Sequence, residues 1–82
     1  MKVTFKLYAT LSDYLPKDAM DHTKELAVAP GTTPNQLIDG HNVPRKMAHL
    51  VVLNGVYVHP AERDQPLHDG DTLAVWPPVA GG

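Results

Sequence analysis

The 82-residue sequence contains no cysteine, which excludes disulfides, thiolate metal sites and iron–sulfur clusters. Basic charge is also scarce, because seven Lys and Arg residues stand against nine Asp and Glu residues and leave a net charge of −2. Proteins that bind nucleic acid present a concentrated basic surface to the phosphates. The composition therefore argues against a nucleic-acid partner.

Long apolar runs are missing as well. The opening stretch MKVTFKLYAT alternates apolar and polar residues, so it is typical neither of a signal peptide nor of a membrane span. We expect a soluble cytoplasmic protein with no membrane partner. A chain of 82 residues has room for one domain with a single compact core.

Side chains that could build a catalytic or metal site are few. The only serine, Ser12, lacks the glycines of a nucleophile elbow. The DGD stretch at 69–71 is typical of a turn, because the spaced acidic ligands of a calcium loop are missing. No two histidines have zinc-site spacing on a helix. The histidines are His22, His41, His49, His59 and His68. We expect no metal, no bound cofactor and no catalytic residues, and therefore a protein that is not an enzyme.

The first half of the chain predicts two strands. VTFKLYAT alternates strictly and places Val3, Phe5 and Leu7 on one face of a half-buried strand. TKELAVA is a weaker strand with Leu26 and Val28 inward. Between them, residues 16–22 have no period-two pattern, which predicts a hairpin with a long connection.

A short helix is expected within PGTTPNQLIDG. Thr32 or Thr33 can cap its first N–H groups, Pro34 suits the first helical position, and Gly40 can end it. The next signal is Asn54-Gly55 in LVVLNGVYV, which predicts a two-residue hairpin turn. That turn pairs 50–53 with 56–59. The face expected in the core carries Val51, Leu53, Val56 and Val58.

A last strand is predicted at TLAVW, with Leu73 and Val75 inward, and Pro77-Pro78 ends it because proline donates no hydrogen bond to a ladder. The order strand, strand, helix, hairpin, strand is an α+β arrangement. We predict a ubiquitin-like β-grasp fold, a mixed sheet of four to five strands with one short helix across one face. The expected domain spans residues 1–77, followed by a flexible tail at 78–82.

The stretch WPPVAGG has properties suited to entering a partner. Its prolines hold the chain extended, and glycine has no Cβ, so a narrow channel can close around the backbone. The residues expected to thread into the partner are Pro77, Pro78, Val79, Ala80, Gly81 and Gly82. The carboxylate of Gly82 is a poor electrophile. As an acyl-adenylate it gains a good leaving group, and a sulfur nucleophile can then form a thiocarboxylate.

Three stretches, KVTFKLYATLSDYLP, LNGVYV and DGDTLAVWPPVAGG, resemble the MoaD/ThiS-type sulfur carriers. These are ubiquitin-like proteins whose C-terminal Gly-Gly is adenylated and thiocarboxylated. The tail PPVAGG is most similar to the small subunit of molybdopterin synthase. The resemblance implies that Gly82 carries sulfur in molybdenum cofactor biosynthesis, as a co-substrate or non-catalytic small subunit.

The resemblance also implies the partners. They are a ubiquitin-activating-type adenylyltransferase that uses ATP and Mg²⁺, the molybdopterin synthase large subunit or thiazole synthase, and a sulfurtransferase or cysteine desulfurase. We expect the free protein to be a monomer. The compact segment 30–48 leaves thiamine thiazole synthesis or tRNA thiolation open as alternative pathways. A protein modifier joined through Gly82 and an interaction module with an inert tail are alternatives of another class.

A docking face is expected on the side of the sheet away from the helix. The predicted register places Leu50, Val52, Tyr57 and Trp76 together there, as an apolar patch near the start of the tail. The alternative is that Trp76 covers the edge of its own domain. The charged residues expected at the rim are Arg45, Lys46 and Arg63.

Overall fold

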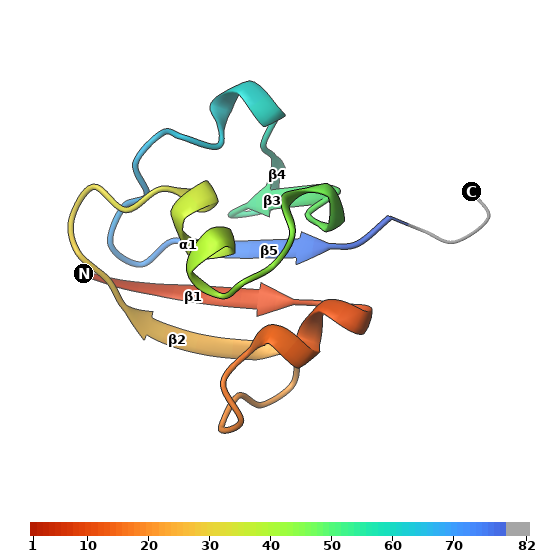
Figure 1. Ribbon diagram of the computed structural model, residues 1–82. Helices are drawn as coiled ribbons and strands as arrows, with labels where there is room; N and C mark the ends of the chain where they lie inside the picture. The colour runs from red at the N-terminus through yellow and green to blue at the C-terminus, as the bar shows by residue number, and fades with distance from the viewer. Residues whose placement is uncertain (79–82) are drawn as a thin grey trace.

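A computed structural model describes residues 1–78. The chain forms one five-stranded sheet with strand order β2-β1-β5-β3-β4 (Figure 1). The strands are β1 (Lys2–Leu7), β2 (Thr23–Ala27), β3 (Leu50–Leu53), β4 (Val56–Tyr57) and β5 (Thr72–Trp76). The helices are α1 (Pro34–Gly40) and three short 3₁₀ helices, η1 (Ala9–Tyr14), η2 (Arg45–Met47) and η3 (Pro60–Glu62).

The sheet is mixed. β1 pairs in parallel with β5, and the other three strand pairs are antiparallel. Figure 1 shows α1 across one face of the sheet. The predicted α+β, ubiquitin-like β-grasp fold is confirmed. Residues 79–82, which hold most of the predicted tail, lie outside the described residues, so the expectation that they form a flexible tail stays a prediction.

The core lies between the sheet and α1. Phe5 and Leu7 of β1 are fully buried, and so are Leu73 and Val75 of β5, as the alternation in the sequence predicts. Ile38 brings the apolar side of α1 into the same cluster. Leu26 and Val28 pack against this cluster from β2 and the residue after it. The inward faces of the first, second and last predicted strands are therefore correct.

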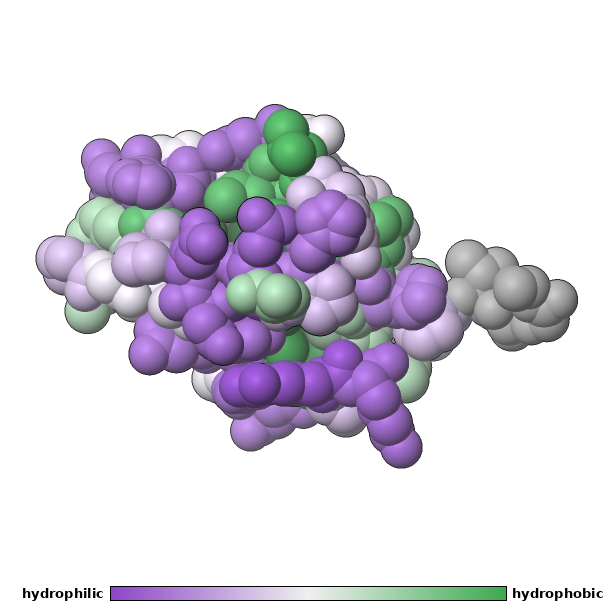
Figure 2. Space-filling model, turned by 90° about the horizontal axis from the view of Figure 1, so that it is seen from above, coloured by the Kyte–Doolittle hydropathy of each residue, from purple (hydrophilic) through white to green (hydrophobic). Residues whose placement is uncertain are grey.

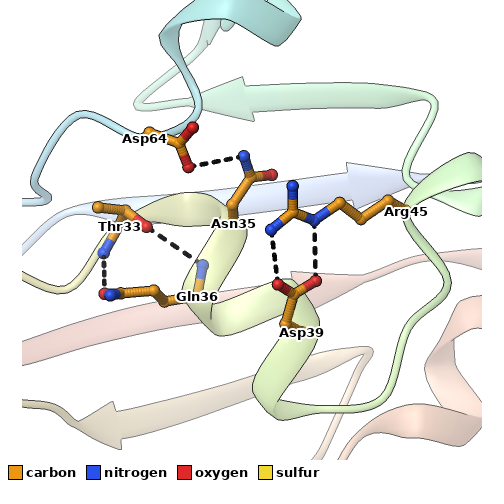
Figure 3. Close-up of polar contacts among 6 residues, drawn as sticks. All are labelled: Thr33, Asn35, Gln36, Asp39, Arg45 and Asp64. Atoms are coloured by element: carbon orange, nitrogen blue, oxygen red, sulfur yellow. Dashed lines mark hydrogen bonds and ion pairs between the residues drawn. The ribbon is translucent and has the colours of Figure 1, made fainter.

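α1 begins with a capping box. The Thr33 hydroxyl accepts from the Gln36 N–H at 3.2 Å, and the Gln36 side chain accepts from the Thr33 N–H at 3.0 Å (Figure 3). Of the two predicted caps, Thr33 is the one used, and Pro34 occupies the first helical turn. The helix ends at Gly40, and Asn42 takes the left-handed conformation with φ of +63°.

The Asn54-Gly55 turn is confirmed. Both residues have positive φ, at +50° and +84°, and Leu53 pairs with Val56 across the turn. The prediction that Val56 lies in the core is wrong, since its exposed fraction is 68%. β4 is a two-residue strand at the edge of the sheet, and both of its residues are exposed. β4 itself ends at Tyr57, and beyond it the Val58 N–H still donates to the Val51 carbonyl at 2.8 Å, as the predicted register requires.

The segment after β1 differs from the sequence prediction. The alternation predicts a strand that continues through residues 8–10, but β1 ends at Leu7 and η1 follows, which brings Leu11 into the core with 1% exposure. Its only serine, Ser12, donates its hydroxyl to the Ala9 carbonyl at 2.9 Å. Within residues 1–78, no helix has the length and hydrophobicity to cross a membrane.

Candidate functional site: the docking face and the tail root

The docking face is the set Leu50, Val52, Tyr57 and Trp76, and the structure places all four on one side of the sheet. Leu50 is the cross-strand partner of Trp76, and Val52 that of Tyr57. Cross-strand partners present their side chains to the same face. Their neighbours Val51 and Val75 point the other way and are fully buried. The docking role of this face stays a prediction.

This face is partly open to solvent. Leu50 and Tyr57 are 38% and 42% exposed, and Val52 and Trp76 are half-buried. Figure 2, which looks down on the β4 edge of the sheet, shows hydrophobic side chains that interrupt a largely hydrophilic surface at that edge. Adjacent exposed apolar residues are what a transient protein partner contacts.

Tyr8 belongs to the same face, although the sequence analysis did not assign it there as a site residue. Its ring stacks on Trp76, with centroids 4.5 Å apart and an interplanar angle of 7°. On its other side it lies 5.6 Å from the ring of His22. The alternation in β1 predicts that Tyr8 points outward. Its proximity to Trp76 follows from the parallel pairing of β1 with β5, which no local pattern indicates.

The tail root, residues 76–78, leaves the sheet from its central strand. The N–H of Tyr8 donates to the Val75 carbonyl and the N–H of His49 donates to the Trp76 carbonyl, both at 3.1 Å. Pro77 and Pro78 have no N–H, so the backbone ladder stops there. The end of β5 is therefore held from both sides, and the chain then departs between them (Figure 1).

An open hollow of about 540 Å³ lies where the docking face meets the tail root. Its lining is formed by Ala9, Thr10, His49, Leu50, Trp76, Pro77 and Pro78. The docking face and the tail root therefore meet at this hollow. A partner on the docking face would lie directly beside the segment that it would have to bind. The predicted residues Val79, Ala80, Gly81 and Gly82 lie outside the described residues.

The other end of β5 is fixed by a polar cross-link. Asp71 is 9% exposed and accepts from the Asn54 side chain at 2.9 Å and from the His68 N–H at 2.7 Å. Asn54 in turn accepts from the Thr72 N–H at 2.8 Å. This arrangement agrees with the turn predicted at 69–71, and it joins that turn to the hairpin. Asp71, which belongs to the DGD stretch that was compared with a calcium loop, therefore has a structural role.

Two ion pairs of the domain are local in sequence. Arg45 donates to both Asp39 oxygens, at 2.6 and 3.0 Å (Figure 3), and this hydrogen bonding lowers the pKa of Asp39 from its ordinary 3.8. Lys24 lowers the pKa of Asp18 in the same way, by a 2.7 Å hydrogen bond and its charge. Among residues 1–78, no three His, Asp or Glu side chains are grouped to hold a metal ion.

Together these features define a class: a β-grasp domain whose central strand runs into a proline-bounded tail root beside an apolar sheet face. The chain belongs to the ThiS family, whose sequence pattern matches residues 6–82. The resemblance to MoaD/ThiS-type proteins is thereby confirmed at the level of the family. A search of the curated proteins found no match.

Three solved structures share the fold. SAMP1 from Haloferax volcanii is 24% identical, with full coverage of both chains and a TM-score of 0.68. A candidate molybdopterin converting factor subunit 1 from Pyrococcus furiosus is 24% identical, with a TM-score of 0.62 over 95% of this chain and 98% of that one. The complex of subunits 1 and 2 of the molybdopterin-converting factor from Helicobacter pylori includes a chain that is 18% identical, with full coverage of both chains and a TM-score of 0.58.

Proposed function

We propose that this protein is a sulfur carrier whose Gly82 carboxylate is adenylated, converted to a thiocarboxylate, and used as a sulfur donor in molybdopterin biosynthesis. The observation that carries the proposal is the tail root. Within residues 1–78, its last backbone hydrogen bond is the one from the His49 N–H to the Trp76 carbonyl, and two prolines follow it. Membership of the ThiS family supports the carrier role.

The proposed chemistry needs no catalytic side chain from this protein. A carboxylate oxygen of Gly82 attacks the α-phosphorus of ATP in the activating enzyme, and pyrophosphate leaves. The terminal sulfur of a persulfide on a sulfurtransferase or cysteine desulfurase then attacks the acyl carbon and AMP leaves, and a thiol reductant cleaves the resulting acyl disulfide, which returns the enzyme's thiol. A C–S bond replaces the C–O bond to phosphate, and the product is the thiocarboxylate. Mg²⁺ and ATP belong to the activating enzyme, so this chain acts as a co-substrate and not as an enzyme.

The docking face explains how different partners could reach the same carboxylate. A ubiquitin-activating-type adenylyltransferase and the large subunit of molybdopterin synthase would each contact the apolar patch and take the tail into a buried site. From Pro78, four further residues extend roughly 13–14 Å, which is enough to cross an enzyme surface. The subunit 1–subunit 2 complex from Helicobacter pylori supports a large-subunit partner.

The test is the intact mass of the protein after incubation with ATP, Mg²⁺, an activating enzyme and a sulfur donor. The expected product carries one sulfur in place of one oxygen, localised to Gly82. A matched control lacks Gly81-Gly82, and it should stay unmodified while its circular dichroism is unchanged. If the shortened protein accepts sulfur, or if the full chain accepts none with several activating enzymes, the carrier proposal is wrong.

The pathway is tested by the sulfur acceptor. The thiocarboxylated protein is offered to a molybdopterin synthase large subunit with its pterin precursor, and separately to thiazole synthase and to a tRNA-thiolating enzyme. Sulfur transfer with the large subunit supports the proposal, whereas transfer only with either of the others moves the protein to that pathway. Stable conjugates on a denaturing gel would instead favour a protein modifier.

A further inference from the structure

Arg63 is a buried cation that is held by backbone carbonyls. Its exposed fraction is 8%, and its guanidinium donates to three backbone carbonyls, those of Val58 at 3.1 Å, Ala48 at 3.0 Å and His49 at 3.4 Å. Among the described residues, no carboxylate lies within ion-pair distance of it. A buried charge is costly unless its donors are satisfied. The sequence analysis expected this arginine at the charged rim, and the structure places it inside.

One peptide unit connects Arg63 to the tail root. The carbonyl of Ala48 accepts from the Arg63 guanidinium, and the N–H of the same peptide, which belongs to His49, donates to the Trp76 carbonyl at 3.1 Å. Because a peptide unit is planar and its C=O and N–H point in opposite directions, fixing one fixes the other. Hydrogen bonds in such a chain also polarise and strengthen one another.

We propose that Arg63 is a positioning residue for the tail: it orients the 48–49 peptide, which holds the last hydrogen-bonded carbonyl of β5 and so sets the direction in which Pro77 and Pro78 leave. This inference rests on the proposed carrier function. Its three hydrogen-bond acceptors, the carbonyls of Val58, Ala48 and His49, belong neither to the docking-face set nor to residues 76–78. A partner that has bound the docking face would therefore receive a tail already aimed at its active site, and less ordering would remain to be done on binding.

A planar fork is needed for this task. The guanidinium reaches three carbonyls in a fixed geometry, whereas the ammonium of lysine is a compact charge on a flexible stem. Methionine can fill the space of the stem but leaves all three carbonyls without their donor. The series arginine, lysine, methionine therefore grades the loss of orientation at nearly constant volume.

The test compares Arg63→Met and Arg63→Lys with the full-length wild type in the adenylation reaction, using an activating enzyme that modifies the wild type. We expect Arg63→Met to lower kcat about tenfold with KM within about twofold, since docking is intact and the tail is misdirected. Arg63→Lys should fall between. The control is Val3→Ala, which removes core volume from β1 at the end remote from Leu7, the residue paired with Val75.

Two kinetic results would overturn the proposal. One is a loss of kcat in Val3→Ala as large as in Arg63→Met at comparable free energy of unfolding, because the effect would then be general destabilisation. The other is an effect confined to KM. Amide hydrogen exchange at His49 tests the same contact without any enzyme: it should be faster in Arg63→Met than in Val3→Ala, and equal rates overturn the proposal. If the wild type is never adenylated, the carrier function fails, while the exchange experiment still decides the role of Arg63.

Discussion

The phenol ring of Tyr8 lies nearly parallel to the indole ring of Trp76, with 4.5 Å between centroids and 7° between planes. The two residues follow β1 and end β5, the parallel pair of the sheet. Trp76 also has Leu50 as its cross-strand neighbour. The stack therefore supports the indole, which also lines the hollow beside the tail root.

Replacing Tyr8 by alanine should remove this support. We expect the free energy of unfolding to fall by about 1–2 kcal/mol, because an aromatic pair contributes roughly 0.5–1.5 kcal/mol beyond its buried area. Urea denaturation followed by circular dichroism measures the loss. Tyr8→Phe keeps the ring and should stay within about 0.5 kcal/mol of the wild type. Equal losses in both variants would contradict a role for stacking.

Leu50→Lys should weaken docking without unfolding the protein, since Leu50 is 38% exposed. A charge at the centre of an apolar contact should raise the KM for the activating enzyme by about tenfold or more, which is about 1.4 kcal/mol. The matched control is Met20→Lys, at a residue that is 77% exposed in the turn before β2. If both lysines raise the KM equally, the effect is one of net charge and the docking face is wrongly assigned.

Asp71→Ala should be among the more destabilising substitutions of an acidic residue. It leaves the His68 N–H and the Asn54 amide without the acceptor that they have at 2.7 and 2.9 Å. Hydrogen bonds to a charged group contribute about 1.5–3 kcal/mol each, and these two to Asp71 are part-buried, so we expect a loss of about 2 kcal/mol or more. Thermal unfolding measures it, with Asp13→Ala on the exposed surface of η1 as the control. A loss no greater than that of the control would contradict the cross-link.

Two glycine substitutions should change the free energy of unfolding in opposite directions. Gly55 has φ of +84°, so Gly55→Ala strains the hairpin turn and should cost about 1–2 kcal/mol. Gly40 ends α1, has no positive φ and would place a Cβ in open space. Gly40→Ala should raise the free energy of unfolding by about 0.5–1 kcal/mol. Denaturant midpoints for the two variants on either side of the wild type would meet this expectation, and midpoints shifted in the same direction would refute it.

The Asp39–Arg45 pair should make its contribution at neutral pH and lose it in acid. The hydrogen bond from Arg45 lowers the pKa of Asp39 below 3.8 in the folded state. The folded protein therefore takes up the Asp39 proton at a lower pH than the unfolded chain does. The contribution is present above 3.8 and disappears as the pH falls through the lowered value. In a carboxyl NMR titration, Arg45→Met should return the midpoint of Asp39 toward 3.8. Lys24→Met should leave Asp39 unchanged and raise Asp18 instead.

Local patterns in the sequence predict most of the fold. The alternation around Phe5 predicts which face of β1 is buried, and Asn54-Gly55 predicts the hairpin and its register. These features depend on neighbours within a few residues, so the pattern contains the information. Val56 is wrongly placed because its alternation is correct but β4 lies at the edge of the sheet, and alternation does not indicate what covers a face.

The sequence predicts the candidate site less completely than it predicts the fold. Leu50, Val52, Tyr57 and Trp76 come together because the hairpin register extends to β5, and a period of two is enough to place them. Tyr8 joins them only through a parallel pairing between strands far apart in the chain. Arg63 acts on backbone carbonyls, which every residue has, so no side-chain pattern marks its partners. Its burial becomes visible only once the loops on either side of the hairpin have been placed.

The position of β5 has a consequence for biosynthesis. It is the last strand along the described chain, yet it lies in the middle of the sheet, between β1 and β3. A nascent chain cannot close its core until residues 72–76 have left the ribosome, and pairing strands so distant in sequence is a slow step in folding. A chain that stops before β5 therefore stays unfolded and open to proteases. Only molecules whose synthesis has reached the tail root can therefore fold.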